Sequence, residues 1–362
     1  MKEKFFYIDF IKVISCIAVM LFHLDMHSFY ADNNAPLFFG LKFLGMNVGD
    51  IAVSLFIISS GFGLGLSAKE NFSLTSYIRK RFLAIYPSYW LSYAIVTLLF
   101  ILLSKPIGEG VPGIKFLLTI IGLDGLFLYK FPTFYLVGEW YTGYMLITYI
   151  FFPFLFLYGL KKPLLSFLLL MGLVVSLHIK YGAIFEMWEP INPLMRLPEF
   201  FFGICFAQNI RKDKLLRGIL TVVALAILVN TSILLDKISY HFVLIMVGIS
   251  FFVIISSVFD IIFIPKYMRE LFSLLSRYSF LAFLVHHQIL LLFYSAFDVA
   301  HSNNFVKFSI LITVITLSFF YGYLIYPLVN YITEKLNNLL FQRFVSNQFL
   351  QSSSLKTYVV YI

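Results

Sequence analysis

The chain has 362 residues, of which 60% are hydrophobic and only 12% are charged, and its mean hydropathy is +0.90. Soluble domains carry roughly 25% charged residues, so this composition excludes a water-soluble fold, whose exterior would have to present apolar side chains to water. The net charge of +9 does not indicate nucleic-acid binding, because the lysines and arginines fall in short segments between apolar runs. The lipid bilayer is therefore an expected partner, and no nucleic acid is expected.

About ten apolar runs are candidates for membrane-spanning helices. A spanning helix needs about 20 mostly apolar residues, so the sequence predicts an all-α polytopic membrane protein with about ten transmembrane helices. The expected spans are 6–27, 48–66, 82–104, 138–159, 163–178, 197–210, 217–235, 241–259, 279–299 and 307–331. A further run, 116–129, is too short to span comfortably and contains Asp124, so it is expected to be re-entrant or interfacial.

The distribution of lysine and arginine predicts the orientation of the spans. Cytoplasmic loops of membrane proteins carry an excess of these residues. If the N terminus is cytoplasmic, the cytoplasmic loops hold the basic cluster Arg79–Arg81 and most of the other basic residues. Counting 116–129 as a span would reverse every later loop, so both termini are expected in the cytoplasm. Residues 1–335 are then one transmembrane domain, and 336–362 are a short cytoplasmic tail.

The first apolar run contains three ionisable residues: Asp9, Lys12 and His23. An ionisable group inside a span is costly and is by default a functional hypothesis. The 11-residue separation of Lys12 and His23 places them within roughly 20° of each other on the helix face and about 16 Å apart along it. One helix face is therefore expected to present a cation near the cytoplasmic end and an imidazole in the outer half, both toward one cavity.

This arrangement suits the transfer of a group from an anionic donor to a hydroxyl. Lys12 would hold the donor, and His23 would act as general base or would accept the transferred group transiently. The structural alternative is that Lys12 extends to the membrane interface and His23 bonds a neighbouring helix. His23 and His27 have the i, i+4 spacing of metal ligands, but no third ligand stands at a defined spacing, so no metal site is expected.

Two polar positions lie near the second and third expected spans. Arg81 either binds an anion or anchors the third span in the membrane interface. Ser60 precedes Gly61 at the end of the second span, and such small residues usually indicate close helix packing.

The later spans contain polar residues of the same kind. Glu139 either lines an aqueous cavity or lies in the interface, and Arg196 either serves the acceptor or pairs with Glu199. His286 and His287 both fall within the ninth expected span. At least one of them must face protein or water, because lipid offers an imidazole no partner.

Taken in order, the motifs resemble those of the acyltransferase-3 family of bacterial membrane-bound acyltransferases. The family signature is an aspartate, a basic residue three positions later and a histidine after ten further residues; Asp9, Lys12 and His23 match it, with lysine in place of the usual arginine. Ser54, Ala84 and Met145 depart from the pattern. Further similar segments are Val53–Phe62, Arg81–Pro87, Trp140–Pro153, Arg196–Gly203 and Ser279–His286.

The resemblance implies a membrane-embedded O-acyltransferase of the bacterial cytoplasmic membrane. The donor would be acyl-CoA, most simply acetyl-CoA, with no tightly bound cofactor, and the carbohydrate acceptor would be a cell-surface polysaccharide or its lipid-linked precursor. A transporter or flippase for a polysaccharide precursor is the alternative, and the oligomeric state stays open. The implied roles are catalysis for His23, donor binding for Lys12, Arg81 and Asp9, and acceptor binding or support for Glu139, Arg196, His286 and Ser60.

Overall fold

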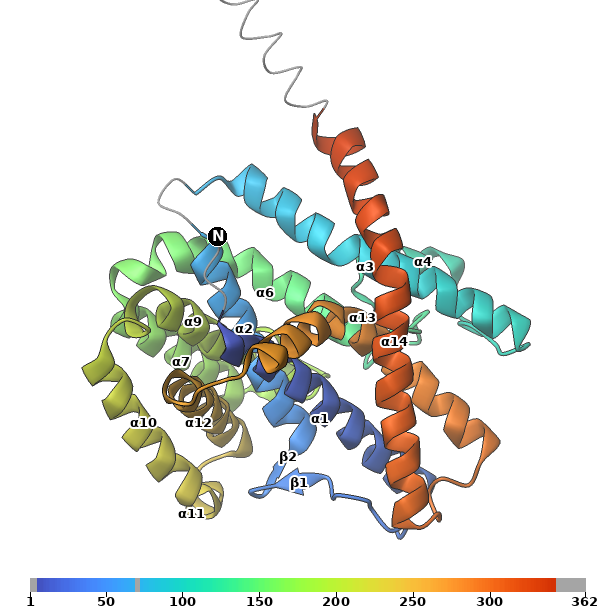
Figure 1. Ribbon diagram of the computed structural model, residues 1–362, viewed down its shortest axis with the longest axis horizontal. Coiled ribbons are helices and arrows are strands. Elements are labelled where there is room, and N and C mark those ends of the chain that lie inside the picture. Colours follow the sequence, from blue (N-terminus) through green and yellow to red (C-terminus); the bar gives the residue numbers. More distant parts are fainter. Residues whose placement is uncertain (1–4, 69–71, 343–362) are drawn as a thin grey trace, which may run out of the picture.

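The computed structural model describes residues 5–68 and 72–342, without the side chains of Glu139, Phe341 and Gln342 (Figure 1). Most of the expected tail, 336–362, lies outside these residues. The all-α prediction is confirmed for the described part, in which seven helices are long and apolar enough to cross a membrane. They are α1 (Phe6–Ala31), α2 (Val48–Ser67), α3 (Leu74–Leu102), α6 (Glu139–Leu157), α12 (Tyr240–Ile261), α13 (Lys266–Ala296) and α14 (Asn304–Asn337).

Three of the expected spans form shorter or bent helices. The first is α7 (Pro163–Ile179), which has 17 residues, and the second is α9 (Leu197–Cys205), which continues into a π-helical turn (Phe206–Ile210). The third divides into α10 (Lys214–Val229) and α11 (Thr231–Lys237), which meet at 70°. The described residues therefore contain seven candidate spans, or eight if the bent pair is one span. The count of about ten and the orientation of the termini stay predictions.

Short elements connect these helices. The only sheet in the described part is an antiparallel pair, β1 (Lys42–Phe43) and β2 (Met46–Asn47), in which Lys42 pairs with Asn47 and Phe43 with Met46. In the turn between the strands Gly45 has a φ of 76°, a value that favours glycine. The remaining short helices are Gly113–Lys115, α4 (Phe116–Ile121), α5 (Asp124–Phe127), Gly159–Lys161, α8 (Tyr181–Ile184), Glu189–Ile191, Leu194–Arg196 and Asn338–Gln342.

Helix α2 lies in the middle of the molecule, beside α1 and α9 (Figure 1). Its contact with α9 depends on glycine. A Cβ atom on Gly61 would lie 2.1 Å from the carbonyl oxygen of Phe200, and one on Gly203 would lie 2.2 Å from that of Ile58. Backbones approach this closely only where side chains are absent, so the packing interpretation is confirmed for Gly61.

The run 116–129 does not form a spanning helix in the structure. It consists of α4 and α5, which are separated by a left-handed turn at Gly122 (φ 76°). Aromatic side chains of α3 bond the carbonyl groups at the end of α4, which membrane lipid would leave unsatisfied. Tyr89 Oη donates to Thr119 O (2.7 Å), Trp90 Nε1 to Ile120 O (2.8 Å) and Tyr86 Oη to Ile121 O (3.0 Å). The expectation that this run is not a span is confirmed.

The end of α1 anchors the loop that leads to β1. The buried carboxylate of Asp25 accepts hydrogen bonds from the backbone amides of Phe38 (2.6 Å), Phe39 (2.9 Å) and Gly40 (2.7 Å). The buried ammonium group of Lys307, on α14, donates to the carbonyl oxygens of Pro36 and Ala300. These bonds hold the loop over the end of α1 that carries His23.

Candidate active site

Lys12 and His23 both lie on α1, but they line different cavities. Lys12 lines a cavity of about 430 Å³ (the Lys12 cavity), and His23 lines a cavity of about 630 Å³ (the His23 cavity). The expectation that both side chains face one cavity is therefore wrong. The physical reason lies on another helix, because the Phe283 side chain of α13 contributes to the walls of both cavities.

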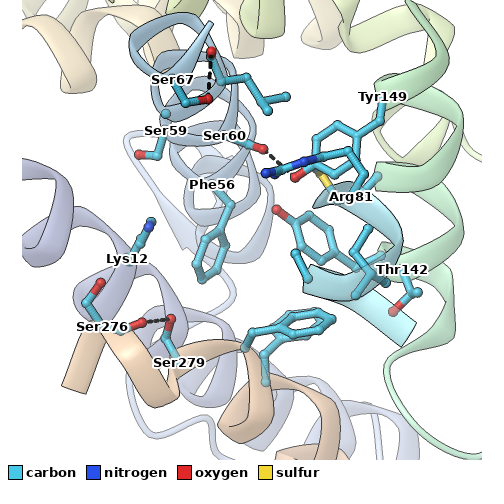
Figure 2. A pocket seen from close by; sticks show the side chains of 18 residues that line it. Lys12, Phe56, Ser59, Ser60, Ser67, Arg81, Thr142, Tyr149, Ser276 and Ser279 are labelled. Carbon is cyan, nitrogen blue, oxygen red and sulfur yellow. Dashed lines mark hydrogen bonds between the residues drawn. The ribbon is translucent and has the colours of Figure 1, made fainter. Parts of the chain in front are cut away.

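The Lys12 cavity combines two cations with several hydroxyl groups. In Figure 2, Lys12 from α1 and Arg81 from α3 point into it from opposite sides. Neither cation forms a hydrogen bond or an ion pair with any described residue, and Nε of Arg81 is buried without a partner. The guanidinium group of Arg81 instead lies 5.7 Å from the ring centroid of Tyr149. The hydroxyl groups come from Ser59, Ser60, Ser67, Ser276, Ser279, Thr142, Tyr141 and Tyr149.

This cavity has the chemistry of an anion site. No aspartate or glutamate is among its described lining residues, so the positive charge of Lys12 and Arg81 is not compensated within it. An anionic group bound there would gain charge-assisted hydrogen bonds from both side chains. Ser60 Oγ lies 2.7 Å from Tyr149 Oη, which holds the tyrosine below Arg81.

The His23 cavity brings together histidines from α1 and α13. The ring centroid of His23 lies 4.9 Å from that of His287 and 5.3 Å from that of His286, and all three side chains line the cavity. His286 Nδ1 donates to the carbonyl oxygen of Phe283 (2.6 Å), so in neutral His286 the proton is on Nδ1 and Nε2 is unprotonated. His286 Nε2 and His23 Nδ1 are buried without a partner in the described structure.

A fourth histidine extends this cluster toward the end of α1. His27 Nε2 and His287 Nε2 lie 3.1 Å apart, so one of them donates to the other. Among the residues that the structure describes, no group of three or more His, Cys, Asp or Glu side chains has an arrangement that could hold a metal ion. The hydrogen bond between His27 and His287 provides a path for a proton between α1 and α13.

The rest of the His23 cavity is aromatic, with a carboxylate on one wall. Asp50, in the first turn of α2, accepts hydrogen bonds from Tyr240 Oη (2.6 Å) and Asn47 Nδ2 (3.2 Å). Aromatic faces beside a fixed carboxylate are surfaces on which a sugar can stack and bond. Asp50 is not among the site residues expected from the sequence, although an acidic residue at the start of an apolar run is a usable signal. The aromatic lining residues are Phe22, Phe29, Tyr30, Tyr129, Tyr135, Trp140, Trp188 and Phe283.

Comparison with known proteins identifies the family. A family profile described as an acyltransferase domain matches residues 5–326, which is most of the chain. The chain belongs to the acyltransferase-3 family. It is also 32% identical over 97 residues to the acyltransferase MdmB of Streptomyces mycarofaciens, a match that covers 26% of this chain and 24% of that protein. The chain thus matches only about a quarter of the length of this relative, and no solved structure matches it significantly.

Two of the expected site residues of this acyltransferase-3 protein lie outside both cavities. Asp9 lines a separate groove with Lys266, Arg269 and Arg277, among others. Arg196 is fully buried and pairs with Glu199, which confirms the structural alternative for this arginine. It also donates to the Ser54 hydroxyl and to the carbonyl oxygens of Pro190 (3.0 Å) and Asp50 (3.4 Å). Arg196 therefore holds the start of α2, where Asp50 lies.

Two of the remaining expected residues of the acyltransferase-3 site line different cavities, and the third is assigned to neither. His286 lines the His23 cavity, on the side expected for the acceptor. Ser60 lines the Lys12 cavity and not the His23 cavity. Glu139 begins α6, and its side chain lies outside the described part of the chain. The roles of these residues stay predictions.

Proposed function

We propose that this acyltransferase-3 protein transfers an acyl group, acetyl in the simplest case, from acyl-CoA to a hydroxyl of a cell-surface polysaccharide or its lipid-linked precursor. The observation that carries the proposal is that two adjoining cavities differ in the chemistry of their lining residues. One is lined by two cations that form no ion pair with any described residue, and the other by histidines and aromatic rings. Donor and acceptor therefore have separate sites with suitable chemistry.

The donor binds in the Lys12 cavity. Coenzyme A is a polyanion, and its phosphates form ion pairs with Lys12 and Arg81, neither of which pairs with a described residue. Arg81 binds an oxyanion with two parallel N–H groups, whereas Lys12 acts as a point charge. A volume of about 430 Å³ lies within the usual range of small-molecule sites, about 300–1,000 Å³, and holds a part of the donor such as the acyl-bearing arm.

The acceptor binds in the His23 cavity. The apolar C–H faces of a sugar ring stack on aromatic side chains such as Trp140 and Trp188, while Asp50 accepts hydrogen bonds from sugar hydroxyls. About 630 Å³ is room for a sugar unit of a longer chain. One hydroxyl of the bound sugar then lies beside His23.

His23 is the general base of the proposed reaction. A neutral imidazole has one unprotonated nitrogen, which removes the proton from the acceptor hydroxyl as its oxygen attacks the acyl carbon. The C–O bond of the new ester forms, the C–S bond of the thioester breaks, and its electron pair leaves with the coenzyme A sulfur. The proton on His23 then passes to this sulfur, which restores the neutral base.

The function is tested with the full chain in nanodiscs, labelled acetyl-CoA and purified bacterial surface glycan. Wild-type protein is expected to place label on the sugar, and His23→Ala to lower the rate by about 100-fold or more. His301→Ala, which removes a histidine outside both cavities, is the matched control. A folded His23→Ala protein that retains full transfer would refute the assignment. Glycan translocation in liposomes without label transfer would favour the transporter instead.

A further inference from the structure

Phe283 occupies a special position between the two cavities. Within the described part of the chain it is the single residue that lines both. Its side chain is almost completely buried, with an exposed fraction of 3%. It lies on α13, three residues before His286.

The neighbours of the Phe283 ring belong to different cavities. On one side its centroid lies 5.0 Å from that of Tyr141 and 6.1 Å from that of Phe56, and both of these residues line the Lys12 cavity. On the other side it lies 5.3 Å from the ring centroid of His286, and Gly138 is so close that a Cβ atom there would lie 2.9 Å from Phe283 Cε1. His286 and Gly138 line the His23 cavity, so the ring fills the space between the two.

This position has a consequence for the transfer reaction proposed above, on which the inference rests. The acyl carbon begins on a thioester in the Lys12 cavity and ends on an oxygen beside His23. We propose that the Phe283 ring is a partition that separates the two cavities and must move aside for the acyl group to pass between them. The ring thereby limits the length of the acyl chain that is transferred. Phe283 is thus a specificity-determining residue.

The backbone at this position favours movement of the side chain alone. The carbonyl oxygen of Phe283 accepts a hydrogen bond from His286, and Leu284 O accepts one from the backbone amide of Gly138 (3.2 Å), so the helix stays attached to the start of α6. A rotamer change turns the ring into one of the two cavities, which provide the space that a packed core lacks. A short acyl group needs only a small displacement, whereas a long chain needs the full volume of the ring.

The test compares acetyl-, propionyl-, butyryl- and hexanoyl-CoA as donors for the protein in nanodiscs. Wild-type protein is expected to prefer the short chains. In Phe283→Ala the ratio of kcat/KM for butyryl-CoA to that for acetyl-CoA is expected to rise at least about tenfold, because one methylene in an apolar pocket already changes discrimination by this factor. Phe283→Leu, which keeps more of the packing, should give a smaller shift in the same direction.

Phe280→Ala is the matched control. Phe280 lies one helical turn earlier on α13 and lines only the Lys12 cavity, so its removal enlarges the donor site without opening the partition. The ratio should stay within about twofold of the wild-type value. An unchanged ratio in both Phe283 variants, with transfer of acetyl still measurable, would overturn the proposal, as would equal shifts in Phe280→Ala and Phe283→Ala.

A second measurement does not depend on turnover. In a background without Cys16 and Cys205, a thiol is introduced by Ser276→Cys, in the wall of the Lys12 cavity. A membrane-impermeant maleimide is applied in sealed vesicles from the side on which the His23 cavity opens. Labelling is expected only when Phe283 is also replaced by alanine, and equal labelling with and without the ring would refute the partition. If no acyl-CoA is a donor but labelling follows this pattern, the proposed function fails while the partition stands.

Discussion

The buried pair of Arg196 and Glu199 allows a prediction that separates packing from charge. Both side chains have an exposed fraction of 0%. Their ion pair includes a bond from Arg196 Nη2 to Glu199 Oε1 (3.1 Å) and a second, shorter bond from Nε to Oε2. Replacing one partner leaves the other as a buried charge without its ion pair, and such changes cost about 3–5 kcal/mol. We therefore expect Glu199→Met and Arg196→Met each to be strongly destabilising.

The double variant Arg196→Met/Glu199→Met should cost much less than the sum of the two single changes. It leaves no buried charge, and the remaining cost comes mainly from the Pro190 carbonyl oxygen, which loses its donor, because Ser54 Oγ keeps its bond to Asp50 O (3.1 Å). An unsatisfied buried group costs about 1–3 kcal/mol. The expected coupling within the double-mutant cycle is therefore at least about 3 kcal/mol.

Thermal unfolding of the protein in detergent micelles measures these differences. Each single change should lower Tm by roughly 6–10 °C, because 1 kcal/mol shifts a large domain by about 2 °C. The double variant should unfold between the single variants and the wild type. If its Tm shift equals the sum of the single shifts, the pair contributes no coupling, and the argument from buried charge is wrong.

The Lys12 cavity, the contact of α2 with α9 and the loop between α13 and α14 can each be tested in the same way. Lys12→Ala and Arg81→Ala should each raise KM for acyl-CoA about tenfold or more, since a lost bond to a charged group costs about 1.5–3 kcal/mol. Steady-state kinetics measures this, with Lys12→Arg as the control that keeps the charge. An unchanged KM would remove these residues from the donor site. Gly61→Val should prevent the normal packing of α2 against α9, because the new Cβ would lie 2.1 Å from the Phe200 carbonyl oxygen. Gly63→Ala should be tolerated, because nothing lies within 4 Å of a Cβ atom there. Size-exclusion profiles of the two variants give the comparison. His301 bonds Asp32 and Asp298 (3.0 Å each), and these bonds raise its pKa above the ordinary 6.5. The stability that protonated His301 contributes to the folded loop is thus fully present below pH 6.5 and is lost as pH rises through the raised pKa. Amide hydrogen exchange around Asp32, corrected for the intrinsic effect of pH, should therefore show less protection at pH 9 than at pH 6 in the wild type and no such change in His301→Gln; the same pH dependence in both proteins would contradict the assignment.

Prediction of the helices was most accurate where length and composition suffice. The runs 6–27 and 48–66 became α1 and α2 with nearly the expected bounds, because an apolar run between polar flanks has few other ways to satisfy its backbone in lipid. The run 217–235 is equally apolar but bends by 70° between α10 and α11. Mean hydropathy contains no information on such a break, which depends on what the helix packs against.

The division between the cavities shows the same limit at the site. The periodicity of a helix fixes the angle between Lys12 and His23 around α1, and the sequence alone determined that they lie on one face. Whether one cavity or two adjoin this face depends on α13, since the Phe283 ring closes the space between them. The chain contains 44 phenylalanines, and hydropathy does not distinguish the one at this position from the others.

The sequence by itself thus determined the membrane class, the family resemblance and most of the ionisable side chains of the site, because these follow from residue type and local spacing. The tertiary structure alone placed Ser60 in the cavity of Lys12 and Arg81, and Asp50 and His287 in the cavity of His23. Each of these placements joins residues that are far apart in the chain. They depend on how close two helices can pack, as glycine permits at Gly61 and Gly203, and on which side chain fills the gap that remains.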